Sequence, residues 1–280
     1  QIEHLIKHGV DEVIINLHYL SNEIKKIIND GKEWGIKVRY SLEETPLGTA
    51  GAVKNAEKFF GSEPLIVFNG DVLTDINISK VVNFHREKGA RVTITLTEVE
   101  DPTEFGLVIT DDKGRVKKFI EKPSWEMVTT RNINAGIYVV DPKIFKQVPR
   151  DEPYSFERQL YPGLLEQGEP IYGFSSDAYW IDIGKPEKYR EAHQAIMRGE
   201  VAVKIIGTRT DRKVWLGKET QIQPSAKLNG PAIIGEKVRI WKNTEIMDYV
   251  VLADGVQVGE SSYLENVIVW KGTKIGSHVR

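Results

Sequence analysis

The stretch PLIVFNGDVL, residues Pro64 to Leu73, predicts a buried strand that ends in an acidic turn. Its apolar run from Leu65 to Phe68 is short and continuous, and Asn69-Gly70 terminates it, which is typical of a strand covered on both faces. Asp71 follows directly. Open α/β sheets bind their ligands just beyond the carboxyl ends of such strands, so Asp71 is a candidate for ligand or metal binding.

A second aspartate stands in a similar setting far downstream. Asp182, in the segment AYWIDIGKP, follows another apolar strand. Each aspartate alone is as consistent with the cap of a turn as with a metal ligand. Brought together by folding, Asp71 and Asp182 would form a hard oxygen site for Mg²⁺, and such a site points to phosphate chemistry.

The segments around the first strand alternate between strand and helix patterns. Strand-like runs at residues 11–17, 37–42 and 91–98 are separated by helical patterns, which predicts βαβ units and a mainly parallel sheet. Residues 106–122 instead indicate a hairpin around the turn sequence DDKG, so the sheet is expected to be mixed. The predicted fold class is therefore α/β, with a Rossmann-like, mixed and mainly parallel sheet.

After about Val201 the sequence repeats with a period of six residues. Aliphatic residues recur at this interval at Leu216, Ile222, Leu228, Ile234, Ile240, Ile246, Leu252, Val258 and Leu264. The frame then slips by one residue and resumes at Val269 and Ile275. Helices and flat strands repeat at about 3.6 and 2 residues, whereas each side of a triangular β-helix points one aliphatic residue inward in every six. The repeat therefore predicts a parallel β-helix.

This change of period divides the chain into two predicted domains. Residues 1–199 form the α/β unit, and residues 200–280 form the β-helix. Both domains are expected to be incomplete. The chain opens inside an amphipathic helix with no strand before it, and it closes in the middle of a hexapeptide repeat.

Composition argues against several functional classes. Of the 280 residues 28% are charged, yet the net charge is only −2, which disfavours nucleic acid and anionic membranes as partners. No run approaches the roughly 18 apolar residues of a membrane helix, and no signal peptide is evident, so we expect a cytoplasmic protein. The absence of cysteine excludes disulfides and thiolate metal sites.

The segment SLEETPLGTAGAV contains the next candidates. It runs from a strand through a loop with Gly48 into a helix. Gly48 allows close backbone approach, and the first N–H groups of the helix are expected to face an anion or a base edge. Gly and Thr before a helix are, however, most often only a turn and a cap.

Four further residues suggest polar recognition when they are taken together. Glu121 and Lys122 in FIEKP look like an ordinary surface pair when taken alone, but Pro123 favours a fixed, extended backbone beside them. Gly106, after Glu-Phe, is most simply a turn glycine. Asn134 lies at the start of the strand NAGIYVV, where Asn is unusual, and this indicates a hydrogen-bonding role.

The following segments occur in order along the chain: ETPLGTAGA, FNGDVL, EFGLV, GRVKKFIEKP, NAGIYVV and YWIDIGKPEKY, and then the hexapeptide repeat. In this order they resemble the sugar-1-phosphate nucleotidylyltransferases, most closely the mannose-1-phosphate guanylyltransferase branch, over essentially the whole chain. The resemblance implies a Rossmann-like domain followed by a left-handed β-helix. It also implies that a sugar 1-phosphate attacks the α-phosphate of a nucleoside triphosphate, so that pyrophosphate leaves and a nucleotide sugar forms.

The same resemblance implies roles for individual residues. The implied catalytic residues are Asp71, Lys122 and Asp182, of which Asp71 and Asp182 hold Mg²⁺. The implied sugar-phosphate subsite consists of Gly106, Glu121, Lys122 and Asn134. The implied nucleotide subsite consists of Glu43, Pro46, Leu47, Gly48, Thr49 and Gly70. Such a reaction needs positioning and charge neutralisation, and it needs no protein nucleophile.

GTP and mannose 1-phosphate are the favoured substrates. The carboxylate of Glu43 is able to accept hydrogen bonds from N1–H and N2–H of guanine. UTP or dTTP with glucose 1-phosphate remains the alternative pair.

One departure from the family leaves a second function open. Family members begin with a strand, a Gly-Thr-Arg loop and a Pro-Lys-Pro segment, about one βα unit or roughly 30 residues, which this sequence does not show. We expect that unit to be omitted from this chain. The alternative is a non-catalytic regulatory homologue that binds a nucleotide sugar.

The β-helix is expected to make subunit contacts in a homo-oligomer. Its exterior carries Trp215, Trp241 and Trp270, which suits an interface or a covered surface. Acyl transfer by the β-helix is disfavoured, because His278 is the only histidine after His193 and no loop insertion interrupts the repeats.

Overall fold

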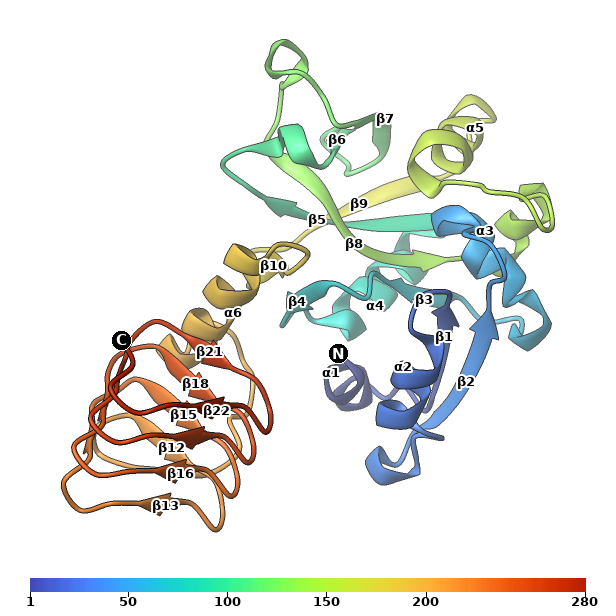
Figure 1. Cartoon of the computed structure of the whole chain (residues 1–280). Helices are drawn as coiled ribbons and strands as arrows, with labels where there is room; N and C mark the ends of the chain where they lie inside the picture. The colour runs from blue at the N-terminus through green and yellow to red at the C-terminus, as the bar shows by residue number, and fades with distance from the viewer. The chain divides into compact units, whose positions relative to one another are not determined.

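A computed structural model describes all 280 residues, which divide into two compact units (Figure 1). The first unit is Gln1–Trp180 and the second is Ile181–Arg280. The division between the compact units therefore falls before helix α6. The domain boundary expected from the change of period falls after that helix, at residue 199, and it stays a prediction. No helix in either unit is long and apolar enough to cross a membrane.

The first unit contains short helices around a sheet. The α-helices are α1 (Ile2–Lys7), α2 (Ser21–Ile28), α3 (Gly48–Asn55), α4 (Ile78–Lys88) and α5 (Tyr161–Glu166). The strands are β1 (Glu12–Leu17), β2 (Lys37–Leu42), β3 (Leu65–Phe68), β4 (Val72–Thr74), β5 (Val92–Glu98), β6 (Gly106–Thr110), β7 (Val116–Glu121), β8 (Asn132–Val140) and β9 (Ile171–Ser175). The buried strand expected before the acidic turn is thus β3.

The strands form a mixed sheet, as predicted. β1 and β2 pair in parallel as a separate two-stranded sheet. The six-stranded sheet has the order β7-β6-β8-β5-β9, and β3 also pairs with β8. Within this sheet only β5 and β9 pair in parallel, because β8 lies antiparallel against β3, β5 and β6.

Direct parallel pairing is therefore less frequent than expected. β3, β5 and β9 do run in one direction, but the insertion of β8 separates β3 from β5. The apolar pattern could not show this, because a strand buried on both faces has the same continuous hydrophobic run whichever way its neighbours point.

Strand β8 bends where the candidate residues gather. Gly136 has a φ of +69°, and the register between β5 and β8 shifts between Ile94 and Leu96. Beyond the bend β3 pairs with β8 as far as Ile137, and before it β6 pairs with β8 at Ile133. Asn134 lies between these two pairings, at the point where one neighbouring strand replaces the other.

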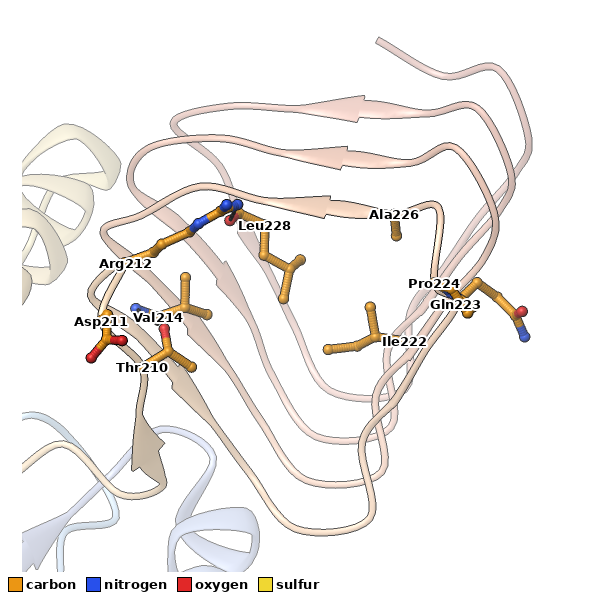
Figure 2. Close-up of a pocket in the computed structure, with 9 residues that line it drawn as sticks. All are labelled: Thr210, Asp211, Arg212, Val214, Ile222, Gln223, Pro224, Ala226 and Leu228. Atoms are coloured by element: carbon orange, nitrogen blue, oxygen red, sulfur yellow. Dashed lines mark hydrogen bonds between the residues drawn. The ribbon is translucent and has the colours of Figure 1, made fainter.

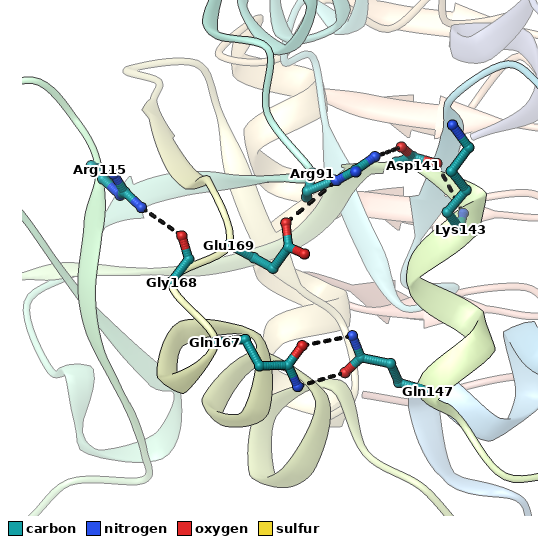
Figure 3. A network of polar contacts seen from close by, with 8 residues as sticks. All are labelled: Arg91, Arg115, Asp141, Lys143, Gln147, Gln167, Gly168 and Glu169. Carbon is teal, nitrogen blue, oxygen red and sulfur yellow. Dashed lines mark hydrogen bonds and ion pairs between the residues drawn. The ribbon is translucent and has the colours of Figure 1, made fainter.

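An aromatic cluster and a polar network stabilise the sheet. Tyr138, Phe145, Phe156 and Tyr161 are fully buried in one cluster. In Figure 3 Arg91 pairs with Asp141 and Glu169, and the side-chain amides of Gln147 and Gln167 donate to one another at 2.9 and 3.0 Å. These contacts connect β5, the loop before β9 and the chain after β8.

The second unit is a coil of short strands preceded by helix α6 (Pro186–Arg198). Strand β10 (Trp180–Asp182) spans the division between the units. The coil contains β11 (Thr208–Arg209), β12 (Val214–Leu216), β13 (Gln221–Ile222), β14 (Lys227–Leu228), β15 (Ala232–Ile234), β16 (Arg239–Ile240), β17 (Glu245–Ile246), β18 (Val250–Leu252), β19 (Gln257–Val258), β20 (Tyr263–Leu264), β21 (Ile268–Val269) and β22 (Lys274–Ile275).

These strands stack in three parallel sheets that form the sides of the coil, as the hexapeptide period predicted. The sheets are β12-β15-β18-β21 with β11 at one edge, β13-β16-β19-β22, and β14-β17-β20. All the aliphatic residues of the repeat belong to one core, including Ile240, Ile246 and Leu252. The predicted slip is also present, because Val214 pairs with Ala232 and Leu252 pairs with Val269, one residue closer along the chain.

Candidate active site

Asp71 lies on the turn between β3 and β4, and its side chain is exposed. The backbone N–H of Asn69 donates to the carbonyl oxygen of Gly136 at 2.8 Å. In turn the backbone N–H of Gly136 donates to Oδ1 of Asn134 at 3.0 Å. The turn that carries Gly70 and Asp71 is therefore held against β8, two residues from Asn134.

Asp182 is the last residue of β10 and belongs to the second unit. Its Oδ1 accepts a hydrogen bond from the backbone N–H of Gly184 at 2.7 Å. Within the first unit, Trp180 Nε1 donates to the carbonyl oxygen of Ala135 at 2.8 Å, so the first residue of β10 is fixed beside Asn134. The pairing of the two aspartates around one ion stays a prediction.

The donor chemistry of these aspartates fits Mg²⁺. No group of three or more His, Asp or Glu side chains in the chain forms a dedicated metal cluster. Mg²⁺ does not need one, because it is usually held by one or two carboxylates together with water and substrate phosphates. The exposed carboxylate of Asp71 and the carboxylate of Asp182 are hard oxygen donors of that kind.

The predicted nucleotide segment forms a closed loop before α3. Glu43 Oε2 accepts from the backbone N–H of Leu47 at 3.0 Å, so one oxygen of this carboxylate holds the loop; Pro46 is exposed and Leu47 is buried. Gly48 has a φ of +69°, and a Cβ there would lie 2.9 Å from the carbonyl oxygen of Tyr154. Glycine is therefore required because the backbone of Tyr154 approaches closely.

The expectation that the start of α3 offers free N–H groups is wrong for two of them. The N–H groups of Ala50 and Gly51 both donate to the carbonyl oxygen of Tyr154, at 2.9 and 3.0 Å. The chain around Tyr154 packs across the start of the helix. The carbonyl oxygen of Tyr154 is the acceptor for these two N–H groups, where a bound anion was expected. The local sequence could not reveal this contact, since Tyr154 lies about a hundred residues further along the chain.

Gly106, Glu121 and Lys122 lie together at one end of the β6–β7 hairpin. Gly106 pairs with Glu121 across the hairpin, and a Cβ at Gly106 would lie 3.0 Å from Glu121 Oε2 and 2.5 Å from Phe119 Cζ. The glycine thus leaves space for the carboxylate. Lys122 is exposed, has a φ of +47° and donates its backbone N–H to the carbonyl oxygen of Phe105 at 3.0 Å.

Glu121 is partly buried, which an ordinary surface pair would not be. Burial raises the pKa of Glu121, and the negative charge of Glu157 raises that pKa further. The charges of Arg158 and Lys122 act in the opposite direction. Two carboxylates therefore face a common region, and a bound group that donates hydrogen bonds would relieve their repulsion.

Asn134 belongs to a short chain of hydrogen bonds. Its Nδ2 donates to the hydroxyl of Tyr138 at 2.7 Å, and that hydroxyl donates to Glu157 Oε1 at 3.2 Å. Burial and the charge of Glu157 raise the pKa of Tyr138 well above its ordinary value, so the phenol keeps its proton. The side chain of Asn134 is therefore held in a defined orientation.

Glu157 was not identified from the sequence, yet it connects the two predicted subsites. Its Oε2 accepts from Thr49 Oγ1 at 2.9 Å and from Ser155 Oγ at 2.7 Å, while its Oε1 accepts from Tyr138. Glu157 lies on the π-helical turn Phe156–Leu160, a rare geometry that is frequent at functional sites. The only sequence signal was Ser155, which caps this turn through the N–H of Glu157.

A hollow in the second unit is unrelated to these residues. It has a volume of about 450 Å³ and lies at the first circuit of the coil (Figure 2). Ile222 and Leu228 point into it in Figure 2, and both pack against the core of the coil. The hollow is therefore the open end of that core.

Comparison with known proteins agrees with the predicted family. Residues 1–199 match the nucleotidyl transferase family. The UTP–glucose-1-phosphate uridylyltransferase of Synechocystis sp. is 30% identical over 100% of this chain and 76% of the relative. The mannose-1-phosphate guanylyltransferase of Mycobacterium tuberculosis is 34% identical over 92% of this chain and 71% of the relative.

A solved structure supports the same assignment. The crystal structure of HddC from Yersinia pseudotuberculosis complexed with GMP-PN matches with a TM-score of 0.59 and 31% identity, over 68% of this chain and 81% of that one. The family match covers the turn with Asp71, the loop before α3 and the residues around Asn134. The chain therefore belongs to the nucleotidyl transferase family.

Proposed function

We propose that this protein transfers a nucleotidyl group from a nucleoside triphosphate to a sugar 1-phosphate. The observation that supports this function best is the network around Glu157. It joins Thr49, from the segment expected along the nucleotide, to Asn134, from the segment expected along the sugar. Such a network fixes the two expected subsites relative to one another, and positioning of two bound substrates lowers the barrier to a reaction between them.

In the proposed reaction an oxygen of the sugar 1-phosphate attacks the α-phosphorus of the triphosphate. The bond from that phosphorus to the bridging oxygen breaks, and pyrophosphate leaves with the electron pair. The exposed ammonium group of Lys122 would neutralise the sugar phosphate, while Glu121, Asn134 and the backbone of Gly106 would hold the sugar hydroxyls. Positioning and electrostatics supply most of the rate in reactions of this class.

Mg²⁺ is the proposed cofactor, with Asp71 and Asp182 as its protein ligands. When bound, Mg²⁺ would neutralise the charge on the phosphates. Asp71 would bring its carboxylate to the carboxyl end of β3, and its turn is fixed on β8 by the contact between Asn69 and Gly136. The anchored Trp180 supports the same arrangement, since Asp182 follows two residues later.

GDP-mannose is the proposed product. The Mycobacterium tuberculosis relative is named a mannose-1-phosphate guanylyltransferase, and HddC was crystallised with GMP-PN, so both favour a guanine nucleotide. The Synechocystis relative is named for UTP and glucose 1-phosphate, which keeps that pair as the alternative. Glu43, whose Oε1 is not used in holding the loop, is the proposed acceptor for guanine.

We also propose a cytoplasmic homo-oligomer with contacts through the coil. Trp241 and Trp270 are 46% and 70% exposed on its surface. Large exposed aromatic side chains are enriched at protein interfaces. The oligomeric state of the full-length protein, measured by light scattering with and without the double substitution Trp241→Ser and Trp270→Ser, tests this part independently of catalysis.

The function itself is tested by pyrophosphate release. Full-length protein with Mg²⁺, GTP and mannose 1-phosphate is expected to release pyrophosphate and form GDP-mannose. Asp71→Ala is expected to abolish turnover, whereas Asp112→Ala, which removes an exposed aspartate from the β6–β7 turn, is expected to leave turnover unchanged. Binding of GDP-mannose without turnover for any common pair of triphosphate and sugar phosphate would contradict the proposal.

A further inference from the structure

We propose that Glu157 is a positioning residue that fixes, through Tyr138, the orientation of the Asn134 amide toward the sugar phosphate. The inference rests on the proposed function and deepens it, because it assigns a specificity role to a residue outside the predicted subsites.

The argument begins with the direction of each hydrogen bond. An ionised carboxylate only accepts, so the hydroxyl of Tyr138 must donate its single proton to Glu157 Oε1, 3.2 Å away. The oxygen of Tyr138 is then an acceptor for the other neighbour, Asn134, at 2.7 Å. Only the Nδ2 end of the Asn134 amide satisfies that acceptor.

The other end of the amide is fixed by the backbone. The N–H of Gly136 is a donor only, and it lies 3.0 Å from Oδ1 of Asn134. A flipped amide would place its NH₂ group against the N–H of Gly136 and its oxygen against Tyr138. The carboxylate of Glu157 and the backbone of Gly136 therefore specify the same orientation from opposite ends.

The fixed orientation determines what Asn134 presents to a ligand. One hydrogen of Nδ2 is used by Tyr138, and the second remains available as a donor. Asn134 is half-buried, so it has one open side. A hydroxyl or phosphate oxygen of the sugar phosphate is the acceptor that this hydrogen would meet.

The carboxylate is itself held in place from the nucleotide side. Thr49 Oγ1 and Ser155 Oγ donate to Glu157 Oε2 at 2.9 and 2.7 Å. Tyr138 is only 1% exposed, so its hydroxyl depends on protein groups for its hydrogen bonds. Glu157 is thus placed to transmit the position of the first turn of α3 to Asn134.

The test is a double-mutant cycle on the full-length protein. Glu157→Gln keeps the shape but removes the charge and one of the two acceptor oxygens, so Tyr138 and the hydroxyls of Thr49 and Ser155 compete for the single acceptor that remains. We expect KM for the sugar 1-phosphate to rise about tenfold to a hundredfold, the loss typical of an unpaired buried polar group. KM for the triphosphate should rise less, because Thr49 Oγ1 keeps its hydrogen bond from the backbone N–H of Phe156 at 2.9 Å. Glu166→Gln, on the exposed end of α5, is the matched control and should change neither constant.

Coupling distinguishes positioning from a general structural effect. If Glu157 acts through Asn134, then Glu157→Gln should have no further effect on KM for the sugar phosphate in an Asn134→Ala background or in a Tyr138→Phe background. Additive effects in both backgrounds would overturn the proposal. Tyr138→Phe keeps the buried ring, so it serves as the second route if Glu157→Gln folds poorly.

A measurement without turnover separates this inference from the proposed function. The side-chain NH₂ resonances of Asn134, assigned in ¹⁵N-labelled protein by their loss in Asn134→Asp, should shift and exchange faster with solvent in Glu157→Gln. Unchanged resonances would refute the positioning role even in an active enzyme. Shifted resonances in a protein that transfers no nucleotidyl group would support the positioning role while the proposed reaction fails.

Discussion

Lys122 combines an exposed side chain with a left-handed backbone. Its φ is +47°, and its N–H is fixed to the carbonyl oxygen of Phe105 at 3.0 Å. A residue other than glycine in this region costs on the order of 1 kcal/mol, and such strain tends to persist where it serves a site. Pro123 follows and makes the backbone stiffer still. The strain indicates a position at which the direction of the lysine side chain matters more than the stability of the backbone.

Lys122→Gly is therefore expected to separate stability from activity. Glycine adopts the same backbone without strain, so the free energy of unfolding should stay equal or rise by up to about 1 kcal/mol, while nucleotidyl transfer is lost. Urea denaturation and pyrophosphate release measure the two effects. Lys118→Gly, at an exposed and ordinary position of β7, should instead destabilise the protein and keep its activity. A destabilised Lys122→Gly variant would contradict this account.

Glu121 should lower the stability of the unliganded protein at neutral pH. Its folded pKa is raised above the ordinary value of 4.5 by burial and by Glu157. The unfolded chain therefore loses this proton first, and the contribution of Glu121 is present below its unfolded pKa and lost as the pH rises through the folded pKa.

Glu121→Gln is expected to raise the unfolding temperature at pH 7 and to leave it nearly unchanged at pH 4. The same substitution should weaken sugar phosphate binding in calorimetry, because an NH₂ group replaces one of the two acceptor oxygens of the carboxylate. Equal changes in unfolding temperature at both pH values would show that the charge of Glu121 is not responsible.

At the scale of elements, the bend in β8 determines where the site residues lie. Gly136 bends the strand, receives the turn of Asn69 on one side and binds Asn134 on the other. A Cβ at Gly136 would lie 2.6 Å from Nδ2 of Asn69 and 3.0 Å from its Cβ. The position thus needs glycine both for its φ and for its space.

Gly136→Ala is expected to cost more stability than Gly89→Ala. Gly89 ends α4 with a φ of +55° and has open space around it, so it isolates the cost of the left-handed backbone, on the order of 1 kcal/mol. Gly136→Ala adds the clash with Asn69, should cost roughly 1 to 3 kcal/mol more, and should reduce turnover by moving Asp71. Equal losses of stability in denaturant titrations would rule out a role for the close packing.

The sequence predicted individual strands and turns better than it predicted which strands pair and which distant residues come into contact. The strand before Asp71, the hairpin from Gly106 onward and the unusual Asn134 were all identifiable, because each depends on local patterns of apolar and turn residues. The antiparallel insertion of β8 was not, since hydrophobicity is the same for either strand direction. Glu157 was missed because an isolated glutamate on a short turn looks like a surface residue until Tyr138 and Thr49 are placed beside it.

At the scale of the whole molecule, the coil was predicted in the greatest detail. The period of six identified the inward residues of the coil and also the one-residue slip, because a single geometric rule governs every side. The sense of the coil and its role in assembly stay predictions. They depend on the backbone twist and on surfaces that a hydrophobic period does not describe.

Ile246→Ala should destabilise the coil by about 2 to 5 kcal/mol, because a fully buried aliphatic side chain is removed from a stacked core. Gln221→Ala, at an outward and exposed position, should change the free energy of unfolding by less than about 0.5 kcal/mol. Denaturant unfolding of the whole chain, followed by circular dichroism, measures both changes. A small effect of Ile246→Ala would mean that the coil tolerates cavities unusually well.

The slip between Leu264 and Val269 has a consequence for how such coils change over evolutionary time. The shortened stretch contains Asn266, whose φ is +50° at a corner, and the strands on either side still pair with the circuit below. A corner therefore absorbs a lost residue without repacking the interior. Duplication of one full circuit would lengthen the coil by about 4.8 Å, the spacing of neighbouring strands. Such a coil can therefore lengthen by whole circuits, and a corner such as the one at Asn266 can lose a residue while the strands on either side stay paired.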